Sequence, residues 1–123
     1  MIDGKIVVAD SHAMPWNESP IQQINQSTYN KVLLDDPDTG MGVKLIRYPA
    51  GLVNPHHTHP CGHGIYVLEG TLVTHRGNFG PGTFVWFPEG EHMEHGATAD
   101  GDVLALFIHN KPFRIDYVSQ EGR

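Results

Sequence analysis

The stretch GLVNPHHTHPCGHGIYVLEG, residues 51–70, carries four of the nine histidines of the chain and its one cysteine. Clustering histidines is costly, because the rings repel one another whenever they are protonated. His57 and His59 are two residues apart, and side chains at that spacing point to the same face of a β-strand. We therefore expect both imidazoles to converge on one metal ion, with His63 joining them after a turn at residues 60–62.

A second histidine-bearing segment, GEHMEHG at residues 90–96, begins a later predicted strand. This segment faces the first one if the sheet closes into a barrel. It contains His92 and His95, either of which could supply a fourth nitrogen. Neutral imidazoles suit one divalent transition metal, namely Fe, Mn, Ni, Cu or Zn.

Short runs of β-forming residues follow one another at spacings of about 8–12 residues, separated by turns. The predicted strands are residues 5–8, 42–49, 64–77 (two strands around a turn at Glu69-Gly70), 83–88, 92–98, 103–109 and 113–118. Residues 10–30 are polar, contain two prolines and lack an apolar period, so we predict an arm or loop there. Helical periodicity is absent, which indicates an all-β sandwich or barrel.

Length and charge narrow the class of protein further. The 123 residues fit one domain, with residues 1–41 as an N-terminal arm and first strands and residues 42–118 as the barrel. A net charge of −6 argues against nucleic acid as a partner, because phosphate binding requires a basic surface. A single cysteine cannot form an internal disulfide, and no apolar run approaches the ~18 residues of a membrane span. We expect a cytoplasmic protein without a membrane partner.

The spacing of these residues resembles that of a small single-domain cupin. In the first cupin motif, Gly51 is followed by five residues, His57-Thr58-His59, His63 at the fourth position after His59, six further residues and Gly70. The second motif begins at Gly82, followed by five residues and Pro88-Glu89-Gly90. The chain departs from the family pattern at His63, where the family has glutamate, and at Met93, where it has histidine.

The resemblance implies a double-stranded β-helix, or jelly-roll barrel, with a metal ion held inside by His57, His59, His63 and a fourth histidine. A barrel without metal, which keeps these histidines as polar groups in a ligand pocket, is the alternative.

Strand parity bears on the identity of the fourth ligand. If Met93 points inward, His95 also points inward and His92 points outward, which favours His95. A β-bulge after Gly90 would reverse this and make His92 the ligand.

The resemblance also implies metal-dependent chemistry on a small molecule. The all-histidine set is similar to that of cupin dioxygenases that hold Fe(II) with three histidines. We therefore expect an oxygenase acting on a small carbonyl or enol-type molecule, with iron favoured. The alternatives are a cupin that binds a sugar or anion without turnover and a metal-dependent isomerase. The isomerase would need a base inside the barrel, and Tyr66 has the parity of the outer face.

Other residues near the histidines have simpler interpretations. His56 has the opposite parity to His57, so we expect it at the surface or beside the site, and His75 is expected in solvent. Arg47 is either a surface residue or the partner of an anionic substrate. Cys61 is either a group close to the metal or a small buried filler.

Residues 103–109 form a continuous apolar run, which predicts that both faces of this strand are buried. The resemblance implies a homodimer built by sheet-to-sheet packing with exchanged N-terminal strands. The alternative is a monomer in which residues 10–30 cover the same surface.

Overall fold

The computed structural model describes residues 4 and 6–117, which fold almost entirely into β-strands. The strands are β1 (Asn17–Ile21), β2 (Gln26–Asp35), β3 (Gly42–Tyr48), β4 (Val53–Thr58), β5 (His63–Glu69), β6 (Leu72–Thr74), β7 (Gly77–Phe79), β8 (Phe84–Phe87), β9 (Met93–Ala97), β10 (Val103–His109) and β11 (Asp116–Tyr117). Two single turns of 3-10 helix, η1 (Ser11–Ala13) and η2 (Gln22–Ile24), precede β1 and β2.

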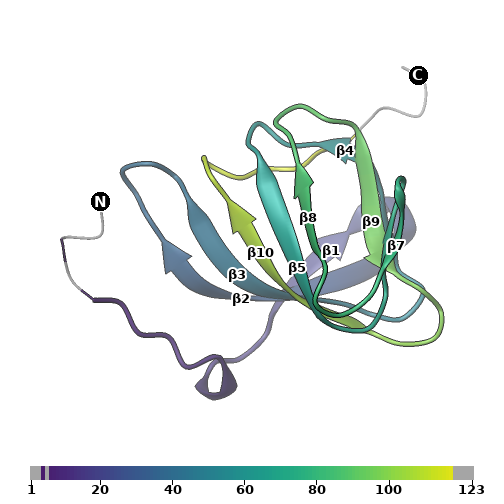
Figure 1. Cartoon of the computed structure of the whole chain (residues 1–123), viewed down its shortest axis with the longest axis horizontal. Coiled ribbons are helices and arrows are strands. Elements are labelled where there is room, and N and C mark those ends of the chain that lie inside the picture. The colour runs from purple at the N-terminus through teal and green to yellow at the C-terminus, as the bar shows by residue number, and fades with distance from the viewer. Residues whose placement is uncertain (1–3, 5, 118–123) are drawn as a thin grey trace.

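The strands form two antiparallel sheets that face each other (Figure 1). One sheet has the order β1-β2-β3-β10-β5-β8, and the other has the order β11-β4-β9-β6-β7. Strands distant in sequence are neighbours in both sheets, as β3 is with β10 and β4 is with β9. The arrangement confirms the all-β jelly-roll fold predicted from the motif spacing.

The core lies between the two sheets. Along β10 the residues alternate between buried and partly exposed, with Val103, Ala105 and Phe107 at 0–3% exposure. The prediction that both faces of residues 103–109 are buried is therefore wrong for this chain alone. One face is core, and the other is only partly covered by side chains of neighbouring strands.

Glycine is required at the turn after β5. Gly70 has φ +83°, and a Cβ at this position would overlap the backbone carbonyl of Asp102. An L-residue avoids this backbone region, so only glycine fits both the conformation and the close approach. Gly51, Gly82 and Gly90 also have positive φ, so the spacing that resembles a cupin marks the turns between strands.

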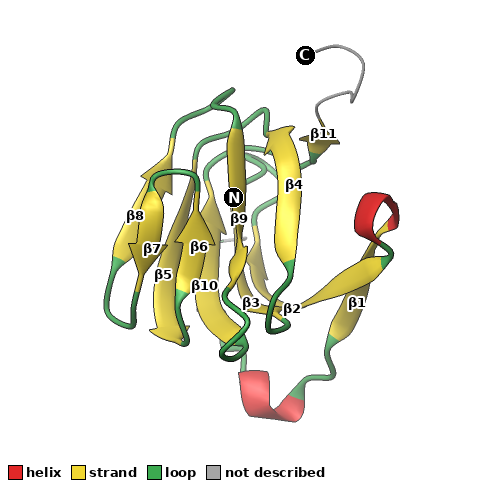
Figure 2. Ribbon diagram, turned by 90° about the vertical axis from the view of Figure 1, so that its right-hand side faces the viewer, coloured by secondary structure: helices red, strands yellow, loops and turns green. Residues whose placement is uncertain are grey.

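The N-terminal third differs from its prediction. Residues 10–30 contain η1, β1, η2 and the first half of β2, rather than an arm or loop without strands. Figure 2 shows β1 to one side of the barrel, paired along β2. Most side chains of β1 are exposed, so the strand can be polar on both faces and shows no apolar alternation.

The predicted end strands are also shorter than expected. Residues 6–8 form no strand, and Ile6 and Val8 are 94% and 87% exposed. Residue 5 lies outside the described residues. Only Asp116–Tyr117 of the predicted strand 113–118 is a strand, and residue 118 also lies outside the described range. In the described part of the chain, no helix has the length and apolar character to span a membrane.

Candidate metal centre

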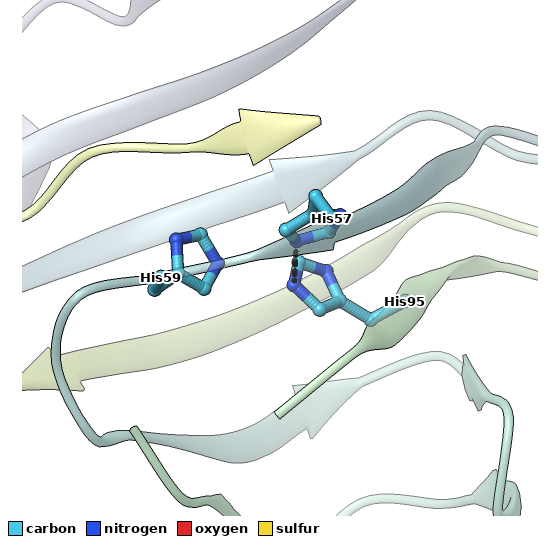
Figure 3. Close-up of side chains that lie close together, drawn as sticks. All are labelled: His57, His59 and His95. Carbon is cyan, nitrogen blue, oxygen red and sulfur yellow. Dashed lines mark hydrogen bonds between the residues drawn. The ribbon is translucent and has the colours of Figure 1, made fainter. Parts of the chain in front are cut away.

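His57, His59 and His95 meet inside the barrel from neighbouring strands (Figure 3). His57 lies on β4, His59 follows that strand directly, and His95 lies on β9, the antiparallel neighbour of β4. Their exposed fractions are 0%, 1% and 2%. An irregularity between Asn54 and His57 in the β4–β9 pairing keeps His57 and His95 on the inner face together.

The ring nitrogens of these three histidines converge. One nitrogen of each ring lies within 4.8 Å of the other two. The Nε2 atoms of His57 and His95 are 3.1 Å apart, and Nε2 of His59 is buried without a hydrogen-bond partner. Two nitrogens that bind one ion at about 2.1 Å and at a right angle are separated by about 3.0 Å, so the arrangement fits a first-row metal ion.

The second nitrogen of each ring is fixed by a neighbour. Nδ1 of His57 donates to the carbonyl oxygen of Pro55 at 2.6 Å, and Nδ1 of His59 donates to that of Arg114 at 2.7 Å. A carbonyl only accepts, so Nε2 of both rings carries the lone pair that a metal requires. Nδ1 of His95 shares a hydrogen bond of 2.8 Å with the hydroxyl of Tyr48.

Burial keeps the interior imidazoles neutral. It lowers the pKa of His57 to about 4, although the hydrogen bond to Pro55 opposes the shift. Burial likewise lowers the pKa of His59 and places that of His95 well below the usual value. All three rings are therefore neutral near pH 7, and none has to lose a net positive charge before it binds a metal ion.

His63 lies beside this group rather than within it. Its ring is stacked between Phe87 and Phe107, with centroids 4.8 Å away on each side, and it is fully buried. Neither of its nitrogens has a hydrogen-bond partner among residues 4 and 6–117, and burial lowers its pKa to about 2. Its ring centroid is 4.5 Å from that of His59, so its nitrogens lie next to the three-histidine group. The group itself does not include His63.

Three further histidines gather on the outside of the barrel. His56, His75 and His92 are exposed, and the ring of His56 lies 6.5 Å from that of His75 and 6.4 Å from that of His92. Nε2 of His56 also lies 3.9 Å from Oε1 of Glu94. The structure thus places His95 inside and His92 outside, as strand parity from Met93 requires, while ligation by His95 remains a prediction.

Of the remaining residues considered from the sequence, two lie on the outer face of the barrel and one is buried. Arg47 points outward and stacks on Trp16 and Tyr29, with its guanidinium carbon 5.1 Å and 5.0 Å from their ring centroids. Tyr66 is 40% exposed, in line with its expected outward parity. Cys61 is fully buried, and burial raises the pKa of its thiol, which favours the neutral, unreactive form.

A cavity of about 80 Å³ adjoins the histidines. Its lining includes two of the metal-site rings, the phenyl groups of Phe107 and Phe113, and the polar side chains of Lys44, Tyr48 and Asn54. The sequence analysis did not identify these last three polar residues as part of the site. Alternation along β3 could have grouped Lys44 with Tyr48, but it could not say which face of that strand is the inner one.

Solved structures share this fold. An RmlC-like cupin protein from Ralstonia eutropha JMP134 aligns with a TM-score of 0.77 and 20% identity over 100% of this chain and 80% of that one. A candidate acetylacetone dioxygenase from Methylibium petroleiphilum PM1 aligns with a TM-score of 0.78 and 12% identity over 97% and 85% of the two chains. A chain of the Rhodobacter sphaeroides complex of SigE with the anti-sigma ChrR aligns with a TM-score of 0.64 and 18% identity. The alignment covers 79% of this chain and 50% of that one.

At these identities the likeness concerns the fold alone. The comparison with curated protein sequences gave no match. The family model for the ChrR cupin-like domain matches residues 5–114, which include both motifs and all the interior histidines. The chain therefore belongs to the ChrR cupin-like domain family.

Proposed function

We propose that the protein is a metal-dependent oxygenase that acts on a small carbonyl or enol-type molecule. The metal ion is held by His57, His59 and His95, with His63 as the fourth ligand. The observation that carries the proposal is the convergence of buried, neutral ring nitrogens, two of them held as lone-pair donors by backbone carbonyls. Without a ligand, the partnerless nitrogens of His59 and His63 would be costly to bury.

Tyr48 fits both the free and the metal-loaded site. In the free site, the Tyr48 hydroxyl donates to Nδ1 of His95, and Nε2 of His95 donates to Nε2 of His57. If a metal ion were held by both Nε2 atoms, the proton of His95 would reside on Nδ1 and would be donated to the Tyr48 oxygen. A hydroxyl serves both states because it donates as well as accepts.

The donor set and the cavity indicate the chemistry. An all-imidazole set suits iron, manganese, nickel, copper or zinc, and oxygenase activity favours iron. A bound metal of this kind would polarise a chelating dicarbonyl as a Lewis acid and bring it together with O₂. At about 30 Å³ for each water, the 80 Å³ cavity holds about three waters, so only a few non-hydrogen atoms of a substrate fit beside the histidines. Phe107 and Phe113 supply its apolar wall.

The fold neighbours are compatible with this chemistry. A candidate acetylacetone dioxygenase has the same fold, and its named substrate is a small dicarbonyl. An isomerase would need a base inside the barrel, and Tyr48, which lines the cavity, is a poor one because its hydroxyl stays protonated. Burial raises the pKa of its hydroxyl far above the usual value.

The test is oxygen consumption by iron-loaded protein with a panel of small β-dicarbonyl and hydroxyketone compounds. The proposal predicts O₂ uptake with at least one compound. Mass spectrometry should then detect a product of oxidative cleavage of that compound. A His57→Ala/His59→Ala variant should consume none, and a His56→Ala/His92→Ala variant, altered only on the outer face, should match wild type. Ligand-dependent stabilisation without product would instead support the alternative of a binding module.

We further propose that the protein is a cytoplasmic homodimer. The outer face of β5 and β8 exposes Tyr66, Leu68, Phe84 and Trp86, each by 38–53%. A second copy packed on this face would bury these side chains and cover the partly exposed face of β10. Sedimentation velocity should then give about twice the monomer mass of 13.6 kDa, and Trp86→Glu should halve it. A monomer at micromolar concentration would contradict the dimer.

A further inference from the structure

Lys44 is a cation inside the barrel. It lies on β3 opposite Phe107 of β10, a core residue. Its Nζ is 4.0 Å from the ring centroid of Phe113 and 5.3 Å from that of Phe107. Lys44 lines both the 80 Å³ cavity beside the histidines and a larger cleft of about 350 Å³. Its ammonium therefore stands where these two hollows approach each other.

This ammonium has no counterion within the described part of the chain. No hydrogen-bond acceptor and no carboxylate among those residues pairs with Lys44. Burial lowers its pKa, which reflects the cost of removing the charge from water. The two phenyl faces offset part of this cost by cation–π attraction, but they provide no hydrogen-bond acceptor. Lys44 is only partly exposed, and lysines in such positions are ordinarily paired, so its ammonium is available to a partner that the described residues do not supply.

The surrounding charges identify that partner as an anion. No acidic side chain among the described residues lines the inner cavity, whereas Asp35 and Asp36 line the outer cleft. Lys44 lines the same cavity as His59 and His95, so a divalent ion held by neutral imidazoles would add two positive charges to its surroundings. An anion is therefore stabilised more in the inner cavity than in the outer cleft.

We propose that Lys44 binds a carboxylate of the substrate, so that the substrate is a small oxo acid rather than a neutral carbonyl compound. The ammonium donates charge-assisted hydrogen bonds to the carboxylate, while the carbonyl oxygens at the other end of the molecule face the histidines. This inference rests on the proposed function for the chemistry at the metal, and it adds the ionic class of the substrate. Arg47, the other cation of β3 in this region, points outward and cannot serve this purpose.

The test compares the binding of two related ligands to the Fe(II)-loaded protein without oxygen. Isothermal titration is performed with 2,4-dioxopentanoate, which carries a carboxylate, and with 2,4-pentanedione, which is neutral. In wild type the acid should bind at least tenfold more tightly than the diketone. Lys44→Met should weaken binding of the acid about 10- to 100-fold, in the range of one charged hydrogen bond, and leave the diketone within about twofold.

Lys44→Arg retains the charge and should restore most of the preference for the acid. Metal content and thermal unfolding of each variant show whether the barrel and its metal are intact, since Lys44 is not among the proposed ligands. Equal affinity of wild type for the two compounds, or failure to bind either, overturns the inference without any variant. Because no oxygen is present, a Lys44-dependent preference for the acid supports the inference even if oxygen uptake is never seen, and in that case only the oxygenase proposal fails.

Discussion

The Nε2 atoms of His57 and His95 lie 3.1 Å apart across the β4–β9 pair, at the centre of the barrel. In the free protein this contact is a hydrogen bond that uses one proton. If a metal ion were held there, it would take the place of that proton, and His95 would carry its proton on Nδ1 instead. The hydroxyl of Tyr48, which is bonded to the other side of the His95 ring, would then accept from it.

Tyr48→Phe should weaken metal binding about tenfold or more. The substitution removes the hydroxyl that would accept the His95 Nδ1 proton in a metal-loaded site, and partners of this kind orient and polarise metal-ligating imidazoles. Competition with a chelator of known affinity measures the change. Tyr66→Phe, at a 40% exposed position on the outer face, is the matched control and should leave affinity unchanged. Equal affinities for the two variants would show that Tyr48 does not support the site.

The metal-free protein should lose stability as the pH falls below about 6.5. The four interior histidines have lowered pKa values, about 4 for His57 and about 2 for His63. Above pH 6.5 both the native and the unfolded chain are neutral at these rings, so they contribute no pH dependence. Below it the unfolded chain binds protons and the native chain does not, which favours unfolding until the pH reaches each native pKa.

At pH 5.5 the free energy of unfolding should be lower than at neutral pH by on the order of 1 kcal/mol for each of these histidines. Urea unfolding at pH 7.5, 6.5 and 5.5 measures it in a range where most carboxylates stay ionised. A flat stability profile between pH 6.5 and 5.5 would mean that the interior rings take up protons without cost.

Gly70→Ala should destabilise the fold by about 2–4 kcal/mol. The positive φ costs an alanine about 1–2 kcal/mol, and the overlap of its Cβ with the Asp102 carbonyl adds a similar amount. Gly80→Ala is the control, because a Cβ there meets no atom within 4 Å. Chemical denaturation of the two variants compares them, and equal stabilities would show that the β5–β6 turn tolerates a side chain.

Much of the fold could be predicted from the sequence, because turns and alternation are local properties. The motif glycines mark backbone with positive φ, which few other residues adopt, so their spacing fixes where strands end. The parity of Met93 and His95 follows from the alternation of a single strand. These features depend on neighbours in sequence and on little else.

The features that sequence missed depend on tertiary contacts. β1 is exposed on most of its length and pairs only with β2, so its residues need no apolar pattern. Along β3 both faces carry apolar residues, with Ile46 on one face and Leu45 on the other. Parity alone therefore could not decide whether Lys44 or Arg47 points inward. The anionic partner that the sequence allowed for Arg47 is the one we propose for Lys44.

The histidine cluster itself divides in a way that only the structure reveals. Alternation along β4 separates His56 from His57, but the meeting of His56 with His75 and His92 requires the packing of several strands. The outer group has exposed rings, and the inner group has buried ones. This division supplies a control for the metal hypothesis within the same molecule.

The most direct test of the central claim is elemental analysis of untagged protein purified without chelator. Wild type should contain close to one first-row transition metal ion per chain. The His57→Ala/His59→Ala variant should contain almost none, and the His56→Ala/His92→Ala variant should retain the wild-type amount. Wild type that stays metal-free after anaerobic reloading, or an inner variant that keeps its metal, would contradict the assignment of His57, His59 and His95 as a metal centre.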